Sequence, residues 1–187
     1  MQEPSRLNAR ASSFLAEYKG AQTQLTVSKT NDHSQVWQPP EGTMYKLNFD
    51  AMVFADMTSS SIGVIIQNNR WQVMAALSSK SHAVVDSEEA EVLVCRRALE
   101  FAVDTGFSKL IVEDDNINVM KSIRSNWVDL SCLGNLHDDI RCMAGYLRHV
   151  DFHSIKRSAN GVAHSLSHYA RHLSEDIVWL EDSPPQP

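Results

Sequence analysis

Three stretches in the first half of the chain have the period of β-strands. In residues 45–50, apolar side chains alternate with polar ones, which is typical of a strand with one buried face. Two further apolar runs, 61–67 and 71–77, lie on either side of an Asn-Asn pair that favours a turn. This part of the sequence therefore predicts an antiparallel meander of three strands.

The period lengthens to that of a helix after Asp86. Apolar residues form one stripe between 90 and 102, either Asp86 or Ser87 can cap the helix, and Gly106 can end it. Residues 110–112 are apolar and flanked by charged residues, as in a buried central strand. The meander is therefore expected to lead into a helix and then a fourth strand.

The remaining sequence alternates between helical and extended patterns. It predicts helices at about 116–125 and 133–147, a strand at 149–155 and a last helix at about 159–173. The resulting order is β-β-β-α-β-α-α-β-α. This order implies an α/β fold with a mixed five-stranded sheet and helices on both of its faces.

The composition changes near Trp37, where residues rich in Gln, Ser, Thr and Asn give way to a Pro-Pro pair. Such punctuation is typical of a linker that leads into a domain. We therefore expect a flexible N-terminal arm and Pro-rich linker over 1–43, one domain over 44–181 and a tail over 182–187. With 43% apolar residues, the chain can bury one sizeable core.

Charge and cysteine content narrow the class of protein. A formal charge of −6 argues against broad non-specific binding of nucleic acid, because such binding depends on Lys and Arg contacts to phosphates. Three cysteines without C-x-x-C spacing indicate neither a disulfide framework nor a zinc site. The first twenty residues contain no apolar run typical of a signal peptide or membrane anchor. We expect a soluble, intracellular, monomeric protein, with nucleus and cytoplasm left open.

Three acidic residues lie at element ends or next to the predicted core, and each has an ordinary alternative interpretation. Asp50 ends the first strand, where it can simply face solvent. Glu91 lies near the start of the long helix, where acidic clusters stabilise the helix dipole. Asp115 follows the fourth strand, where either it or Asp114 can cap the next helix.

The order of these acids along the chain says more than any one of them. An acid on strand one, another on the first long helix and a third after strand four can converge at one edge of the sheet. Converging carboxylates repel one another unless cations neutralise them. Oxygen ligands of this kind suit Mg²⁺ or Mn²⁺ better than zinc.

Four motifs in this order resemble a known family. They are residues 46–51 (KLNFDA), 89–92 (EAEV), 112–116 (VEDDN) and 156–164 (KRSANGVAH). Together they resemble the plant ribonuclease-H-like domain related to retrotransposon reverse transcriptases. Residues 37–40 and 179–185 are also similar to members of that group, so the resemblance covers most of the chain.

The resemblance implies a set of site residues. Type 1 ribonucleases H use an Asp-Glu-Asp-Asp set, whose first three members fall on Asp50, Glu91 and Asp115 of this chain. The fourth falls on His164, which departs from the pattern of the enzymes. As an alternative, His164 is an ordinary polar position on the last helix.

The same resemblance implies the chemistry and the partner. Two Mg²⁺ ions, about 3.5–4 Å apart, would bind among Asp50, Glu91 and Asp115, with Mn²⁺ also possible. His164 would bind a metal or move a proton. The partner would be an RNA–DNA hybrid, with no membrane involved.

Three residues are candidates for contacts with nucleic acid. Ser87 lies near Glu91 at the start of the helix and is a candidate for the 2′-hydroxyl that distinguishes RNA from DNA. Arg157 can bind a phosphate, or it can be a solvated loop cation. Asn160, in the last motif, is assigned to nucleic-acid binding as well.

Three functional hypotheses follow from these residues. The first is a metal-dependent endonuclease that hydrolyses the RNA strand of RNA–DNA hybrids. The second is a catalytically silent module, derived from a retroelement, that binds nucleic acid or another protein. It is supported by His164, by the acidic balance and by the lack of a basic, Trp-bearing substrate handle within 126–133. The third is a fragment of a longer retroelement protein.

Overall fold

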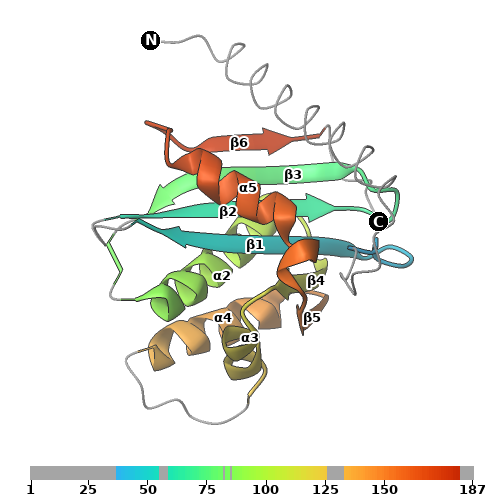
Figure 1. Cartoon of the computed structure of the whole chain (residues 1–187). Coiled ribbons are helices and arrows are strands. Elements are labelled where there is room, and N and C mark those ends of the chain that lie inside the picture. The colour runs from blue at the N-terminus through green and yellow to red at the C-terminus, as the bar shows by residue number, and fades with distance from the viewer. Residues whose placement is uncertain (1–36, 55–58, 82, 85, 126–132, 182–187) are drawn as a thin grey trace, which may run out of the picture. The chain divides into compact units, whose positions relative to one another are not determined.

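The computed structural model describes residues 37–54, 59–81, 83–84, 86–125 and 133–181. Its elements follow in the order β1 (Tyr45–Val53), β2 (Ser60–Gln67), β3 (Val73–Ser81), α2 (Ser87–Asp104), β4 (Lys109–Asp114), α3 (Ile117–Arg124), α4 (Gly134–Tyr146), β5 (His149–Ser154), the 3-10 turn η1 (Arg157–Ala159), α5 (Gly161–Ala170) and β6 (Ile177–Leu180) (Figure 1). This is the predicted order of strands and helices, with one strand added at the end.

The strands form one mixed sheet in the order β5-β4-β1-β2-β3-β6. β1 pairs antiparallel with β2 and parallel with β4, so it lies between the meander and the crossover part of the sheet. Every residue of β2 is buried, as expected of a strand covered on both faces. The predicted mixed sheet is confirmed. β1 lies at its centre, between β2 of the meander and β4 of the parallel part.

The prediction of five strands was wrong by one, because β6 pairs antiparallel with β3. β6 has only four residues, and its side chains alternate between partly buried and exposed. A strand this short at the edge of a sheet buries little apolar surface. The sequence therefore carries a weak signal for it.

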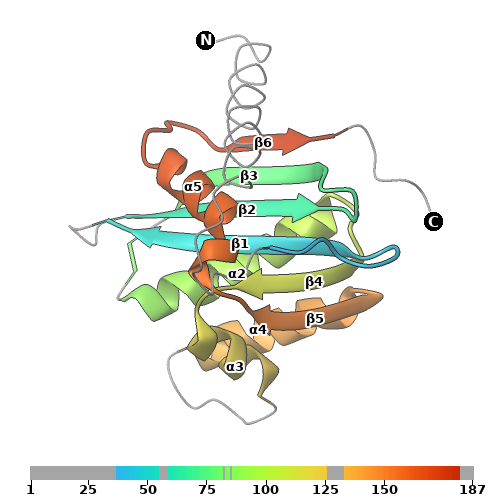
Figure 2. The same cartoon turned by 45° about the vertical axis from the view of Figure 1, so that its right-hand side comes forward.

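Helices cover both faces of the sheet, as predicted (Figures 1 and 2). α5 packs on β1, β2 and β3, while α2 packs against β1 on the other face and contacts α3 and α4. Gly63 on β2 lets α5 come close, because a Cβ atom there would lie 2.1 Å from the Ala163 carbonyl oxygen and 2.4 Å from the Ser167 nitrogen. This close approach brings the polar residues of α5 against β1.

The helix ends correct two expectations. Asn116 caps α3 by accepting hydrogen bonds from the backbone N–H groups of Asn118 and Val119, so neither Asp114 nor Asp115 is the cap. Both carboxylates are thus left for other contacts. The last helix is also shorter than predicted, because 157–159 form the separate turn η1 and the helix ends at Ala170.

Trp37 is buried, with 8% of its surface exposed, and packs with Ile155 and Ala159. Its ring also makes an edge contact with Trp71, with the centroids 5.0 Å apart. Trp37 precedes the predicted domain start at residue 44, and the division of the chain into arm, domain and tail stays a prediction. Residues 1–36 of the predicted arm, the 182–187 tail and most of the 126–133 segment lie outside the described residues.

Within the described ranges, no helix combines the length and apolarity needed to cross a bilayer.

Candidate active site

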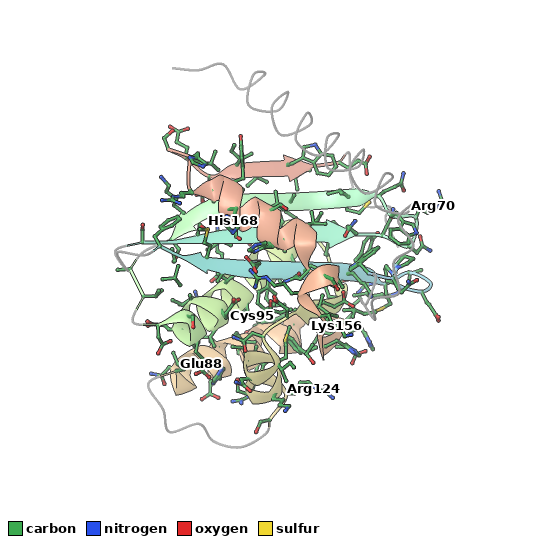
Figure 3. All side chains as sticks on the ribbon, viewed as in Figure 1. Arg70, Glu88, Cys95, Arg124, Lys156 and His168 are labelled. Atoms are coloured by element: carbon green, nitrogen blue, oxygen red, sulfur yellow. The ribbon has the colours of Figure 1, made fainter. Side chains whose placement is uncertain are left out.

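Four carboxyl groups gather where β1 and β4 approach α2. The parallel register pairs Asn48 with Glu113, so Asp50, within β1, and Asp115, just after β4, lie at the same level on adjacent strands. Glu91 reaches this place from α2, since its carboxyl group interacts electrostatically with Asp50, Asp114 and Asp115. In Figure 3, Cys95 on α2 and His168 on α5 mark the two helices that flank β1. The predicted convergence of Asp50, Glu91 and Asp115 is therefore present.

Burial and the neighbouring negative charges disfavour the charged forms of two of these groups, Glu91 and Asp114. Burial, together with the charges of Asp114, Asp50 and Asp115, raises the pKa of Glu91 to about 10 against the opposing effect of a hydrogen bond from the Ala51 backbone N–H. Burial also raises the pKa of Asp114 to about 7, although the Asn116 N–H lowers it. Without a cation, the cluster therefore keeps protons at neutral pH.

Asp50 faces α5 rather than solvent. The side chain is 2% exposed, its Oδ2 accepts a hydrogen bond of 2.5 Å from the Ser167 hydroxyl, and the same oxygen lies 3.2 Å from His164 Nδ1. The interpretation of Asp50 as a solvated strand residue was wrong. The ring of His164 also makes an edge contact with His168, at 4.4 Å between centroids.

Arg157 lies on the solvent side of this cluster. Its Nη1 is 3.3 Å from Asp115 Oδ2, and its Nη2 is 3.2 Å from both ring nitrogens of His164. The Arg157 side chain is 65% exposed, whereas that of Asp115 is 15% exposed. The guanidinium group therefore supplies an accessible positive charge beside an acidic site.

Ser87 and Asn160, the other two predicted site residues, have very different surroundings. Ser87 is the first residue of α2 and is exposed, one helical turn before Glu91. Asn160 is 1% exposed, and its amide donates to Phe49 O at 2.8 Å and to Asp115 Oδ1 at 3.1 Å. Its burial favours a role inside the protein over direct contact with a ligand.

The sequence reasoning missed three residues of the site. Asp114 was weighed only as a helix cap, although it is fully buried beside Glu91 and Asp115. Ser167 was not singled out, although its i+3 spacing from His164 places both on one face of a helix. Asn48 looked like an ordinary polar residue of an alternating strand, and no local signal marked it.

The donor atoms fit a hard divalent cation. Glu91 Oε2 is buried and has no hydrogen-bond partner among the described residues, and carboxylate oxygens are the ligands that Mg²⁺ and Mn²⁺ prefer. In the part of the chain that the structure describes, no three Asp, Glu, His or Cys side chains are arranged so that they could hold a metal ion. Ser167, Asn160 and Arg157 engage the carboxylates instead.

The family of the chain follows from a match to a family model. The model described as "reverse transcriptase-like" matches residues 48–170, a range that includes Asp50, Glu91, Asp115 and His164. The chain belongs to the reverse-transcriptase-like family. No curated protein matches its sequence.

Solved structures show the fold of this reverse-transcriptase-like chain. RNase H1 from the halophilic archaeon Halobacterium salinarum NRC-1 superposes with a TM-score of 0.63 at 19% identity, over 68% of this chain and 97% of that one. The N-terminal RNase H domain of rv2228c from Mycobacterium tuberculosis gives 0.61 at 18% identity, over 69% and 94%. LC11-RNase H1 in complex with an RNA/DNA hybrid gives 0.52 at 15% identity, over 67% and 94%. The predicted ribonuclease-H-like fold is thereby confirmed.

Proposed function

We propose that the protein is a metal-dependent endonuclease that hydrolyses the RNA strand of RNA–DNA hybrids. The observation that carries the proposal is the convergence of Asp50, Glu91 and Asp115 at one place in a ribonuclease-H-like fold. A protein of that fold, LC11-RNase H1, has been solved with an RNA/DNA hybrid. In the present chain, we place such a substrate over the cluster of Asp50, Glu91 and Asp115.

Asp50, Glu91 and Asp115 would hold the metal, which we propose to be two Mg²⁺ ions. Mn²⁺ would serve instead if His164 is also a ligand, because an imidazole suits Mn²⁺ better than Mg²⁺. When bound, the ions would supply activation of a water and stabilisation of the leaving 3′ oxygen. The unpartnered Oε2 of Glu91 supports this assignment, because a buried carboxyl oxygen without a hydrogen bond is costly unless a cation uses it. Neutralisation by a cation would also allow Glu91 to ionise at neutral pH.

The remaining residues would bind substrate and move protons. His164 Nδ1 faces Asp50 Oδ2, so its imidazole can hold or transfer a proton beside the metal ligands. Arg157, largely exposed beside Asp115, would bind a phosphate of the hybrid. Ser87, exposed at the start of α2, would form a hydrogen bond with a 2′-hydroxyl, either as donor or as acceptor.

A catalytically silent nucleic-acid-binding or interaction module of retroelement origin is the alternative function. It is favoured by His164 at the position of a carboxylate, and by the contact of Arg157 with Asp115, which places a positive charge next to a presumed metal ligand. The plant and retroelement descent that the motifs imply, and the monomeric state, belong to the proposal in either form.

The deciding experiment is cleavage of a labelled RNA–DNA hybrid by the purified protein in Mg²⁺ and, separately, in Mn²⁺. The Asp50→Asn variant is the control. Cleavage of the RNA strand that requires metal and is lost in the control would support the enzyme. A folded protein that binds the hybrid without cutting it in either metal would support the silent module.

A further inference from the structure

A chain of hydrogen bonds runs from Trp37 to the carboxyl cluster. The Trp37 indole N–H donates to Asn48 Oδ1 at 3.0 Å, and Asn48 Nδ2 donates to Asn160 Oδ1 at 3.4 Å. Asn160 Nδ2 in turn donates to Asp115 Oδ1 at 3.1 Å and Asp114 Oδ1 at 3.3 Å. This series of hydrogen bonds therefore begins before β1 and ends on Asp115, a predicted metal ligand.

The links come from separate elements and are shielded from water. Trp37 precedes β1, Asn48 lies on β1, Asn160 stands immediately before α5, and Asp115 follows β4. Figure 2 shows the polypeptide entering α5 beside the end of β4. Asn48 and Asn160 are 2% and 1% exposed. Hydrogen bonds in such surroundings are stronger than in water, and breaking one leaves a buried group without a partner.

The Trp37 indole fixes the direction of these hydrogen bonds together with two groups that only accept, the Glu113 carboxylate and the Phe49 carbonyl. An indole nitrogen only donates, whereas an amide can present either its oxygen or its nitrogen. Trp37 therefore requires Asn48 to turn its oxygen towards the indole, which leaves Asn48 Nδ2 facing Glu113 Oε2 and Asn160 Oδ1. Asn160 must then direct its Nδ2 at Asp115.

The opposite orientation of Asn160 would harm the site. It would place the amide oxygen against Asp114 and Asp115, where the present structure has N–H donors. It would also remove the hydrogen bond that Asn160 donates to Phe49 O at 2.8 Å, beside Asp50. Two carboxyl groups would lose a donor and face a partial negative charge instead.

We propose that Trp37 is a positioning residue of the site, which acts through Asn48 and Asn160 to hold Asp115. The catalytic consequence rests on the proposed function, but the hydrogen-bonded relay does not. The segment before β1 is then more than a linker, because docking of its Trp37 orders a metal ligand that follows β4. Asn160 likewise acts by holding Asp115 rather than by touching the substrate.

The first test compares Trp37→Phe with Trp71→Phe in the metal-free protein of 187 residues. Both variants alter the same aromatic pair, but only Trp37→Phe removes the donor to Asn48. The measurement is hydrogen exchange of the Asn160 side-chain amide by NMR. We expect about tenfold faster exchange in Trp37→Phe, because this variant loses roughly one net hydrogen bond. We expect no change in Trp71→Phe. Equal protection of Asn160 in a folded Trp37→Phe variant would overturn the relay.

The second test adds metal and substrate to the same two variants. Trp37→Phe should weaken Mg²⁺ binding in calorimetry by about three- to tenfold and lower kcat with little change in KM for the hybrid. If Trp37 had a purely structural role, Trp37→Phe would lower the melting temperature without weakening Mg²⁺ binding or lowering kcat at unchanged KM. Mg²⁺ affinity and kcat equal to those of the wild type would overturn the positioning role. If the wild-type protein binds neither Mg²⁺ nor Mn²⁺, the proposed function fails, while the metal-free exchange still decides the relay.

A third measurement needs only the wild-type protein and serves if Trp37→Phe does not fold. Mg²⁺ is titrated while the indole N–H resonances of Trp37 and Trp71 are followed. The Trp37 resonance should shift with the midpoint found by calorimetry, and the Trp71 resonance should stay in place. Mg²⁺ binding that leaves the Trp37 indole unchanged would contradict the coupling.

Discussion

His164 Nδ1 lies 3.2 Å from Asp50 Oδ2, so an imidazole is in contact with the carboxylate that ends the alternation of the first strand. Ser167, one helical turn further along α5, donates its hydroxyl to the same Asp50 oxygen. An imidazole brings less negative charge and a softer donor than the carboxylate that the family resemblance leads one to expect. Under the proposed function, the pair would therefore make the choice of metal, and the rate of cleavage, sensitive to residue 164.

The His164→Asp variant should bind Mg²⁺ about tenfold more tightly, equivalent to about 1.4 kcal/mol, and cleave the hybrid faster in Mg²⁺ than the wild type does. The reason is the added oxygen ligand beside Asp50. Calorimetry and single-turnover cleavage measure the two effects. His168→Asp is the matched control, because His168 packs on His164 but, among the described residues, is not hydrogen-bonded or ion-paired to the carboxyl cluster. Equal gains in both variants would refute a site-specific role for His164.

The Asp50→Asn variant should lose metal-dependent cleavage by at least about 100-fold, while its thermal midpoint stays level or rises. The asparagine oxygen can still accept the hydrogen bond from Ser167, and removal of one negative charge relieves repulsion with Asp114. Cleavage assays and thermal unfolding give both numbers. Undiminished cleavage by a folded Asp50→Asn protein would eliminate the assigned site.

The metal-free protein should become less stable as the pH rises. The pKa of Glu91 is raised from 4.5 to about 10 and that of Asp114 from 3.8 to about 7, so the folded protein retains protons that the unfolded chain has released. The free energy of unfolding is therefore highest below about pH 4 as far as these groups are concerned. It falls as the pH rises through about 7 and on towards about 10.

Thermal unfolding from pH 5 to pH 10, with and without Mg²⁺, checks this dependence. Mg²⁺ should flatten the slope, because a cation favours the ionised carboxylates. Glu91→Gln should flatten it without metal, whereas Glu88→Gln, an exposed position on the first turn of the same helix, should not. A metal-free midpoint that rises steadily between pH 7 and pH 10 would contradict the arrangement of charges.

Replacement of Arg157 by Gln should act in opposite directions on metal and on substrate. Without the hybrid, Mg²⁺ should bind more tightly, because the guanidinium no longer pairs with Asp115. Binding of the hybrid should weaken. The slope of its log affinity against log salt concentration should fall by about one, which corresponds to one phosphate contact. Calorimetry and binding at several salt concentrations measure these effects. A loss of both affinities together would show instead that Arg157 mainly holds the site in shape.

The close contact between β2 and α5 predicts a large effect of a single methyl group. Gly63→Ala should destabilise the protein by about 3 kcal/mol, because the new Cβ would lie 2.1 Å from a backbone oxygen of α5. Gly145→Ala in α4 has nothing within 4 Å and should stabilise the helix by about 0.5–1 kcal/mol. Denaturant unfolding of both variants checks the contrast. A neutral Gly63→Ala would mean that α5 is free to shift away from β1.

Much of the architecture was predictable from local pattern. The alternation in 45–50 and the longer period after Asp86 depend on side chains close together in sequence, so they predicted β1 and α2 before any tertiary contact was known. The same holds for Asp50, Glu91 and Asp115 as candidates, since the periodicity assigns one to the first strand, one to the long helix and one to the end of the fourth strand. Their order was enough to predict convergence, because parallel strands end at one edge of the sheet.

Other features were decided by contacts between residues that are distant in sequence. β6 exists because β3 offers an edge, and Asp114 is buried beside Glu91 of α2 and Asn160, which precedes α5. Asn48 bonds to a residue 112 positions away, although its own neighbours mark it only as a polar strand residue. Local sequence determines which face of an element is polar. Which buried amide meets which carboxylate depends on how the elements pack, and only the tertiary structure decided it.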